Sequence, residues 1–479
     1  MRPKIVKIIW QISSPLAIVM AFIPIVLSIF YGDINCDSAY FLCMVERISQ
    51  GSLLYQDIHC GYTPLWFYMM AGLKWLFHIS YGKYEVYLMI HYIIQILSAY
   101  FLYKIIRNLQ IHKYIAFFSA WLFVMMTHWL QGNIILLEMP SMMFGLLSIW
   151  LILSLKDKLS WMYILIGILS SLSFLCKQFG FGFLLLSLYL IIFITKNKWQ
   201  NILYFLVGYM IPIIICYAIW KNYFISIIFS EYGTKTAAEA GYDISITQKL
   251  KWILNNYKEL FSRIAVILPI SFLFLATIIK QNKIIEYIFC WCGIVGFMFQ
   301  FYFVGGGFHY KLYTIPFVVI IIALLLSLNF SNKWLKLIIY IPIILMTMYS
   351  MYAVYNNRVR KLYMHPELKY SQYKLADEVK KQIKPNSTIW IVHGGIYYVY
   401  YLSNILPPNL STIGYSFGPI GISEEKASKQ ISSANYVLSF TKDYDFESFY
   451  TPANKKIVWK HKCVYLSDAV VLHDMSELK

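Results

Sequence analysis

The sequence predicts a polytopic α-helical membrane protein with about eleven transmembrane helices, followed by a small C-terminal extracytoplasmic α/β domain. Of its 479 residues, 59% are hydrophobic and only 13% are charged, whereas water-soluble domains carry about 25% charged residues. The apolar residues also fall in repeated runs of about 20, the length that crosses a bilayer as a helix. A large soluble core needs no such series of long apolar runs, so the composition favours a membrane protein.

Eleven apolar runs are candidates for spans. The first is too long for the apolar region of a signal peptide and lacks a clear cleavage site, so we expect it to be retained. The spans are expected at residues 9–31, 84–103, 114–130, 135–154, 160–176, 178–195, 200–220, 263–279, 284–304, 312–330 and 334–354.

The net charge of +18 is distributed as a topology signal. With the N-terminus in the cytoplasm, the inner segments hold 14 basic and two acidic residues, and the outer loops before residue 355 hold 11 and 10. Short basic loops on the cytoplasmic side are the expected pattern for a protein of the plasma or inner membrane. The charge therefore predicts an outward C-terminal tail and argues against a nucleic-acid partner.

The first outer loop, residues 32–83, contains two predicted helices. One runs from Ser38 to Gln50 and ends at Gly51, since glycine commonly follows a helix end. The other is apolar from Pro64 to Phe77, too short to cross, so it predicts a helix at the membrane interface or a re-entrant segment. The same loop holds Cys36 and Cys60, and both a disulfide and two separate thiols remain open.

The tail alternates predicted helices and strands, which is typical of a small α/β domain. Helices are expected at 368–384 and 396–404, and strands at 388–395, 434–440, 456–461 and 468–475. The sequence thus divides into a transmembrane domain, residues 1–354, and an extracytoplasmic domain, residues 355–479.

Ionisable residues gather at the outer span ends and in the first loop. Such groups are costly near the bilayer and are usually functional. The predicted topology places seven of them on the outer side: Asp33, Asp37, Asp57, Glu138, Lys177, His309 and Lys311. Their convergence predicts an outward-facing active site.

Structural and functional interpretations stay open for the acidic candidates. Asp37 could cap its helix or act as a general base on an acceptor hydroxyl, with Asp33 as a weaker candidate for the same role. Asp57 could serve the loop structurally. Glu138 could bind sugar hydroxyls, pair with a basic group, or extend its carboxylate to the membrane surface.

The basic candidates suit a phosphate ligand. Lys177, in a tight outer turn, could reach for the membrane surface or contact a lipid phosphate. His309 and Lys311 follow three glycines, which allow close approach of backbone to ligand, and both can hold phosphate oxygens. No strand, GxxxxGK[ST] loop and helix occur in series, so a nucleotide-binding loop is not predicted.

At these residues the chain resembles the polyprenyl-phosphate-sugar-dependent glycosyltransferases of the GT-C class, near the protein O-mannosyltransferases and lipid A aminoarabinose transferases. A motif after the first span, Asp-Glu-Ala-Tyr-like in the family, reads DSAY here, from Asp37 to Tyr40. The later motifs follow in order as Gly51, Asp57 and TPL (63–65), LEMP with Glu138, FLCKQFG with Lys177 and Gln178, and FHYKLYTIP with His309 and Pro316.

The resemblance covers nearly all of residues 1–354. It implies that Asp37 is the catalytic base and that Lys177 and His309 lie near the donor phosphate. Three departures are visible: Ser38 replaces the commoner Glu, Glu138 replaces Asp, and residues 305–311 contain no Arg. We expect Lys311 to substitute for that Arg.

The sequence therefore predicts transfer of a hexosyl or pentosyl group from a polyprenyl-phosphate-linked donor to a hydroxyl of a lipid, glycan or protein. Asp33, Tyr40, Asp57, Glu138 and Gln178 are assigned to the sugar or acceptor. No metal or other cofactor is required, and membrane lipids are the surroundings. Two rivals remain: a transporter or flippase, which predicts midplane polar residues and related halves, and a non-catalytic membrane partner that presents the tail.

Overall fold

The computed structural model describes residues 3–58, 60–156, 160–229, 245–263, 266–299, 308–330, 332–391, 396–407, 431–441, 458 and 460–475. The chain forms two compact units. We call the first the helical unit; it comprises Met1–Phe30, Met89–Phe224 and Ile244–Met364. The second, the mixed unit, comprises Tyr31–Leu88, Ile225–Asp243 and His365–Lys479.

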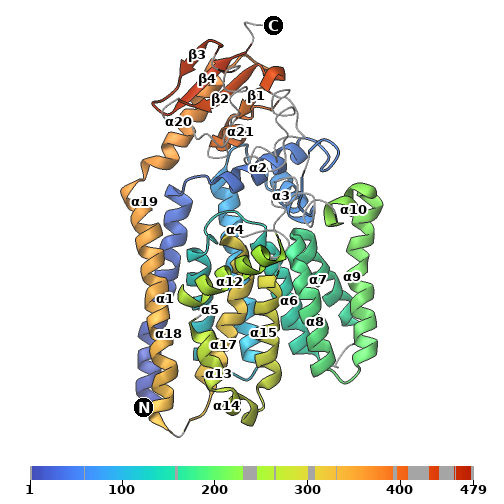
Figure 1. Cartoon of the computed structure of the whole chain (residues 1–479), viewed down its shortest axis with the longest axis vertical. Helices are drawn as coiled ribbons and strands as arrows, with labels where there is room; N and C mark the ends of the chain where they lie inside the picture. Colours follow the sequence, from blue (N-terminus) through green and yellow to red (C-terminus); the bar gives the residue numbers. More distant parts are fainter. Residues whose placement is uncertain are drawn as a thin grey trace. The chain divides into compact units, whose positions relative to one another are not determined.

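The helical unit is built mainly of helices, many of them long and apolar (Figure 1). They are α1 (Pro3–Tyr31), α4 (Tyr84–Asn108), α5 (Lys113–Trp129), α6 (Glu138–Leu155), α7 (Met162–Cys176), α8 (Phe181–Ile194), α9 (Lys198–Trp220), α10 (Asn222–Phe229), α12 (Ile246–Arg263), α13 (Ile267–Leu273), α14 (Leu275–Lys280), α15 (Ile284–Phe299), α17 (Ile315–Ser327), α18 (Lys333–Val354) and α19 (Arg360–Met364). Helices η1 (Gln178–Gly180) and η2 (Phe308–Thr314) are 3-10, and η3 (Tyr355–Val359) is a π-helix.

Each of the eleven expected spans overlaps a helical segment, although residues 264–265 and 300–304 of two of them lie outside the described residues. Six helices among the described residues are long and apolar enough to cross a membrane by length and composition, and three shorter apolar segments accompany them. The run at 263–279 is divided into α13 and α14 at Phe274. These helices confirm the prediction of a polytopic helical membrane protein. Helices suit a bilayer because backbone polar groups in lipid must be paired within them.

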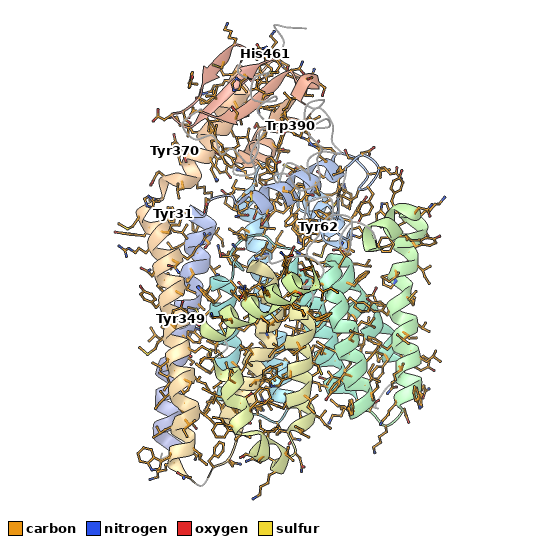
Figure 2. The ribbon with its side chains drawn as sticks, viewed as in Figure 1. Tyr31, Tyr62, Tyr349, Tyr370, Trp390 and His461 are labelled. Carbon is orange, nitrogen blue, oxygen red and sulfur yellow. The ribbon has the colours of Figure 1, made fainter. Side chains whose placement is uncertain are left out.

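Close contacts show which helices are neighbours in this unit. Helices α7 and α9 approach so closely that a Cβ on Gly167 would lie 2.0 Å from the Phe205 carbonyl oxygen, and one on Gly208 would lie 2.0 Å from that of Ile164. Small residues at such crossings are typical of membrane helices. Tyr349 of α18, labelled in Figure 2, packs edge-on against Trp129 of α5 with ring centroids 6.0 Å apart.

The mixed unit combines the first loop with the C-terminal residues. The first loop supplies α2 (Cys36–Ser49) and α3 (Leu65–Leu76). The C-terminal residues supply α20 (Glu367–Gln382), α21 (Tyr398–Ser403) and strands β1 (Ile389–Ile391), β2 (Tyr436–Phe440), β3 (Cys463–Tyr465) and β4 (Val470–Asp474). Gln50 caps α2 and Gly51 follows with φ +99°, so the expected end of this helix is confirmed.

The strands form one mixed sheet in the order β1-β2-β4-β3. β1 and β2 are parallel, whereas β4 pairs antiparallel with both β2 and β3. Trp390, labelled in Figure 2, packs with Val437 and Val458 in its core. The expected small α/β domain is therefore confirmed.

The strand expected at 456–461 is wrong in the part of that range that is described. Val458 is helical and fully buried in the core, and the edge strand β3 begins only at Cys463. The prediction rested on the short apolar run at 457–459. Its described residue, Val458, is buried without strand pairing, and a short apolar run alone does not separate a strand from another buried segment.

Candidate functional site

In the helical unit, Glu138 and Lys177 form a buried ion pair. Glu138 is the first residue of α6 and Lys177 follows the last residue of α7. Lys177 Nζ donates to Glu138 Oε1, and the two residues are 2% and 0% exposed. Of the alternatives open for Glu138, pairing with a basic group is the one found. Burying two charges is costly unless they neutralise each other, so each residue holds the other in place.

Aromatic rings line the ammonium group of this pair. Lys177 Nζ lies 4.6 Å from the ring centroid of Tyr310 and 5.6 Å from that of Phe179. The two rings meet edge to face with centroids 4.7 Å apart. Because ring faces attract cations, η2 places Tyr310 where it stabilises the charge of Lys177.

Lys311 adds a second buried cation in the same unit. It is 1% exposed, and its carbonyl accepts a hydrogen bond from Thr314 Oγ1 at 2.7 Å. Gln178 opens η1 and is half-buried. The side chain of His309 lies outside the described residues. The structure thus brings Glu138, Lys177 and Gln178 together at the α6 and α7 ends, with η2 against them.

Gly180 shapes the turn that carries Lys177. Its N–H donates to the Lys177 carbonyl at 2.8 Å. A Cβ here would lie 2.3 Å from the carbonyl carbon and oxygen of Ser173 and 2.6 Å from the nitrogen of Phe174. Only glycine fits against this backbone, so the sequence FLCKQFG encodes a turn too tight for any side chain at its end.

Gly180→Ala is expected to lower the melting temperature, because overpacking costs about 1–3 kcal/mol. The matched control is Gly296→Ala on α15, where an added Cβ meets nothing within 4 Å. Thermal unfolding of the two purified variants measures the difference. Equal melting temperatures would show that the turn has room to relax.

In the mixed unit, Asp37 lies in the first turn of α2. The N-cap is Asn35, whose side chain accepts from the Asp37 N–H at 2.8 Å. The capping role considered for Asp37 therefore belongs to Asn35. The half-buried carboxylate of Asp37 lies 4.0 Å from Cys36 Sγ, and burial together with the charge of Asp37 raises the pKa of the Cys36 thiol to about 11.

The other candidates in this unit differ in their surroundings. Asp33 is half-buried, and Tyr40 is 5% exposed with its ring 5.4 Å from that of Phe41. Asp57 is exposed, and its carboxylate accepts from the Leu53 N–H at 2.7 Å while its own N–H donates to the Leu53 carbonyl. This closed turn fits the structural role considered for Asp57. No disulfide joins Cys36 to Cys60 in the described chain.

Glu46 departs from its expected place. Its place in the sequence, nine residues beyond Asp37 and down the same helix, predicts a solvated side chain, but this prediction is wrong. Glu46 is fully buried and pairs with Lys74 of α3, whose Nζ lies 2.7 Å from Oε2. Burial raises the pKa of Glu46, and the hydrogen bond from Lys74 opposes this rise without cancelling it. A lone lysine in the apolar α3 was the signal for a buried partner.

Glu46 makes the stability of the mixed unit depend on pH. A raised pKa means that the folded chain binds the proton more tightly than the unfolded chain. Its contribution is complete below its ordinary pKa of 4.5 and is lost as the pH rises through the raised value. Glu46→Gln is therefore expected to reduce the fall in melting temperature across this window. The matched change at Glu378, paired on the surface with Lys381, should leave the profile of melting temperature against pH unchanged.

A polar cluster in the helical unit was not predicted from the sequence. With the Asn133 amide oriented to donate to the His128 carbonyl at 3.1 Å, its oxygen accepts from Arg358 Nη2 at 2.9 Å. Arg358, on the π-helix η3, also donates from Nε to Ser28 Oγ at 3.4 Å. His128 is 3% exposed, and both its ring nitrogens lack a hydrogen-bond partner in the described residues. Arg358 simply follows the last apolar run, so nothing in the sequence indicated its pairing with Asn133 and Ser28.

Comparison with solved structures identifies the fold of this chain. No protein-family description and no curated protein match this sequence. Among solved structures, ArnT from Cupriavidus metallidurans in the apo state superposes with a TM-score of 0.58 at 10% identity, covering 96% of this chain and 98% of that one. The chain has the fold of ArnT.

A second ArnT structure, bound to undecaprenyl phosphate, superposes with a TM-score of 0.57 at 11% identity and covers 96% of both chains. ArnT is an aminoarabinose transferase of the GT-C class. The resemblance to this class is therefore confirmed at the level of the fold. The match covers 96% of this chain, so it includes residues of both units.

Proposed function

We propose that this integral membrane protein is a glycosyltransferase of the GT-C type. It would move a sugar from a polyprenyl-phosphate-linked donor to a hydroxyl of a lipid, glycan or protein on the extracytoplasmic face. The observation that carries the proposal is the ArnT-like fold over 96% of the chain, together with two buried lysines in the unit that holds the membrane helices.

In this proposal Asp37 is the general base. Its carboxylate takes the proton of the acceptor hydroxyl as the acceptor oxygen attacks the anomeric carbon of the sugar. The bond from that carbon to the phosphate oxygen breaks, and polyprenyl phosphate leaves with the bonding electrons. One direct displacement inverts the anomeric centre, and the scheme requires no cofactor.

The basic residues act on the leaving phosphate. Negative charge builds there in the transition state, where fixed cations contribute most. Lys177 is held by Glu138 and by the Tyr310 ring, so it would meet the phosphate with little reorganisation. Lys311 and His309 would complete the phosphate site.

The remaining candidates are assigned to the sugar and the acceptor: Asp33, Tyr40, Asp57, Glu138 and Gln178. In the proposed topology the N-terminus is cytoplasmic, residues 1–354 form the transmembrane domain and residues 355–479 the extracytoplasmic domain, in the plasma or inner membrane. The exposed Trp75 and Phe77 at the end of α3 suit a membrane interface.

The proposal is tested with the purified full chain in lipid nanodiscs. A panel of undecaprenyl-phosphate-linked sugars is supplied with a cell-envelope fraction as acceptor, and released undecaprenyl phosphate and labelled acceptor are measured. We expect both to appear together for one sugar. Movement of the intact donor between leaflets of proteoliposomes, without release of undecaprenyl phosphate, would instead establish the flippase alternative.

A further inference from the structure

We propose that Gln372, in the C-terminal part of the mixed unit, is a positioning residue for Asp37. The inference rests on the proposed function, in which Asp37 is the base. It gives the C-terminal domain a task in the reaction: it holds the helix that carries the base.

The contact is a two-point clamp on a single residue of the backbone. The Ile34 N–H donates to Gln372 Oε1 at 2.8 Å, and Gln372 Nε2 donates to the Ile34 carbonyl at 3.1 Å. Ile34 is 2% exposed. A buried backbone donor and acceptor both need partners, and one primary amide satisfies the two together.

The clamp acts where the chain has no regular structure. Helix α1 ends at Tyr31 and α2 begins at Cys36, so Asp33 and Ile34 lie between the two helices, whereas the Asn35 carbonyl already accepts the first bond of α2, from the Ala39 N–H at 2.9 Å. Asn35, next to the clamped residue, caps α2 by accepting from the Asp37 N–H. Gln372, Ile34, Asn35 and Asp37 are therefore linked in series. A shift at Ile34 is passed through the cap to the first turn of α2.

The other end of α2 is held by the same part of the chain. Arg47 Nη1 donates to Gln50 Oε1 at 2.9 Å and to Asn404 Oδ1 at 3.0 Å. Arg47 Nη2 donates to the Ile405 carbonyl at 3.4 Å. Asn404 and Ile405 follow α21, so C-terminal residues restrain the 14-residue helix at both ends. A helix held at both ends resists sliding along its axis.

The decisive variant is Gln372→Leu, which keeps the side chain's approximate size and removes both hydrogen bonds. We expect kcat to fall by about 10- to 100-fold, because small misplacements of a catalytic group are costly, with KM changed less than about threefold. The matched control is Gln382→Leu, an exposed glutamine on the same helix, which should behave as wild type.

Two further measurements separate positioning from mere stability. Amide hydrogen exchange at Ile34 should accelerate in Gln372→Leu and not in Gln382→Leu, because only the first loses the bond to that N–H. In an Asp37→Asn background, Gln372→Leu should cause no further loss of rate, because residues that act as one unit are not additive. Gln372→Glu keeps the acceptor for the Ile34 N–H and should give an intermediate kcat; it carries the test if Gln372→Leu misfolds.

The outcomes are distinct. If Asp37→Asn shows its expected large loss of rate while Gln372→Leu matches Gln382→Leu in kcat, the positioning role is overturned and the proposed function stands. A loss of rate in Gln372→Leu that multiplies with that of Asp37→Asn would overturn it as well. If Asp37→Asn transfers sugar at the wild-type rate, the base assignment in the proposed function fails, and the positioning role fails with it.

Discussion

Asp37→Asn is expected to lower the rate of sugar transfer by about 10²- to 10⁴-fold, the range supplied by a positioned general base. The amide is nearly isosteric with the carboxylate but accepts no proton at neutral pH. Asn35 would still cap α2 through the backbone N–H of residue 37, so the helix should persist. The measurement is single-turnover transfer from the donor identified in the panel assay.

The control for this change is Asp377→Asn, an exposed aspartate on α20, which should keep the wild-type rate. Asp33→Asn is the informative companion, because Asp33 lies one helical turn earlier in the sequence. A large loss in Asp33→Asn with none in Asp37→Asn would move the base to Asp33. Loss in neither would exclude both carboxylates.

Lys177→Met is expected to destabilise the protein by about 3–5 kcal/mol, the usual result of leaving one buried charge without its partner. Glu138 is fully buried, so its carboxylate cannot regain water when the lysine is removed. The same variant should bind undecaprenyl phosphate more weakly, because a phosphate-binding cation is lost. Melting temperature and binding of undecaprenyl phosphate measure the two effects separately.

The double variant Lys177→Met with Glu138→Gln separates the effect on stability from the effect on phosphate binding. It removes both charges, so the melting temperature should recover part of the way towards wild type, whereas phosphate binding should stay weak. Recovery of both properties would show that Lys177 serves stability alone. Full phosphate binding in the single variant would contradict the assignment to the donor phosphate.

Much of the fold was accessible from the sequence, because its causes are local. Each apolar run must satisfy its own backbone in lipid, so the expected spans coincide with helices. The α2 helix ended where Gly51 predicted it, since a positive φ suits glycine. The strand predicted at 456–461 was wrong, because Val458 is buried in a core without pairing in a strand.

The candidate site was also predictable only in part. The predicted topology put Asp37 in the first outer loop and Glu138 and Lys177 at outer span ends. The buried position of Glu46 was missed, because its partner Lys74 lies on another helix. Charge in a helix that looks amphipathic is read as solvated until a packed neighbour is known.

The sequence by itself determined the membrane class, the positions of the helices and the resemblance to GT-C enzymes. These depend on apolar run length and on short motifs, and both are properties of neighbouring residues. Only the tertiary structure decided that Lys177 pairs with Glu138, 39 residues away, and that Gln372 clamps Ile34, 338 residues away. Such contacts depend on how helices pack, because side-chain partners are chosen by distance in space and not along the chain.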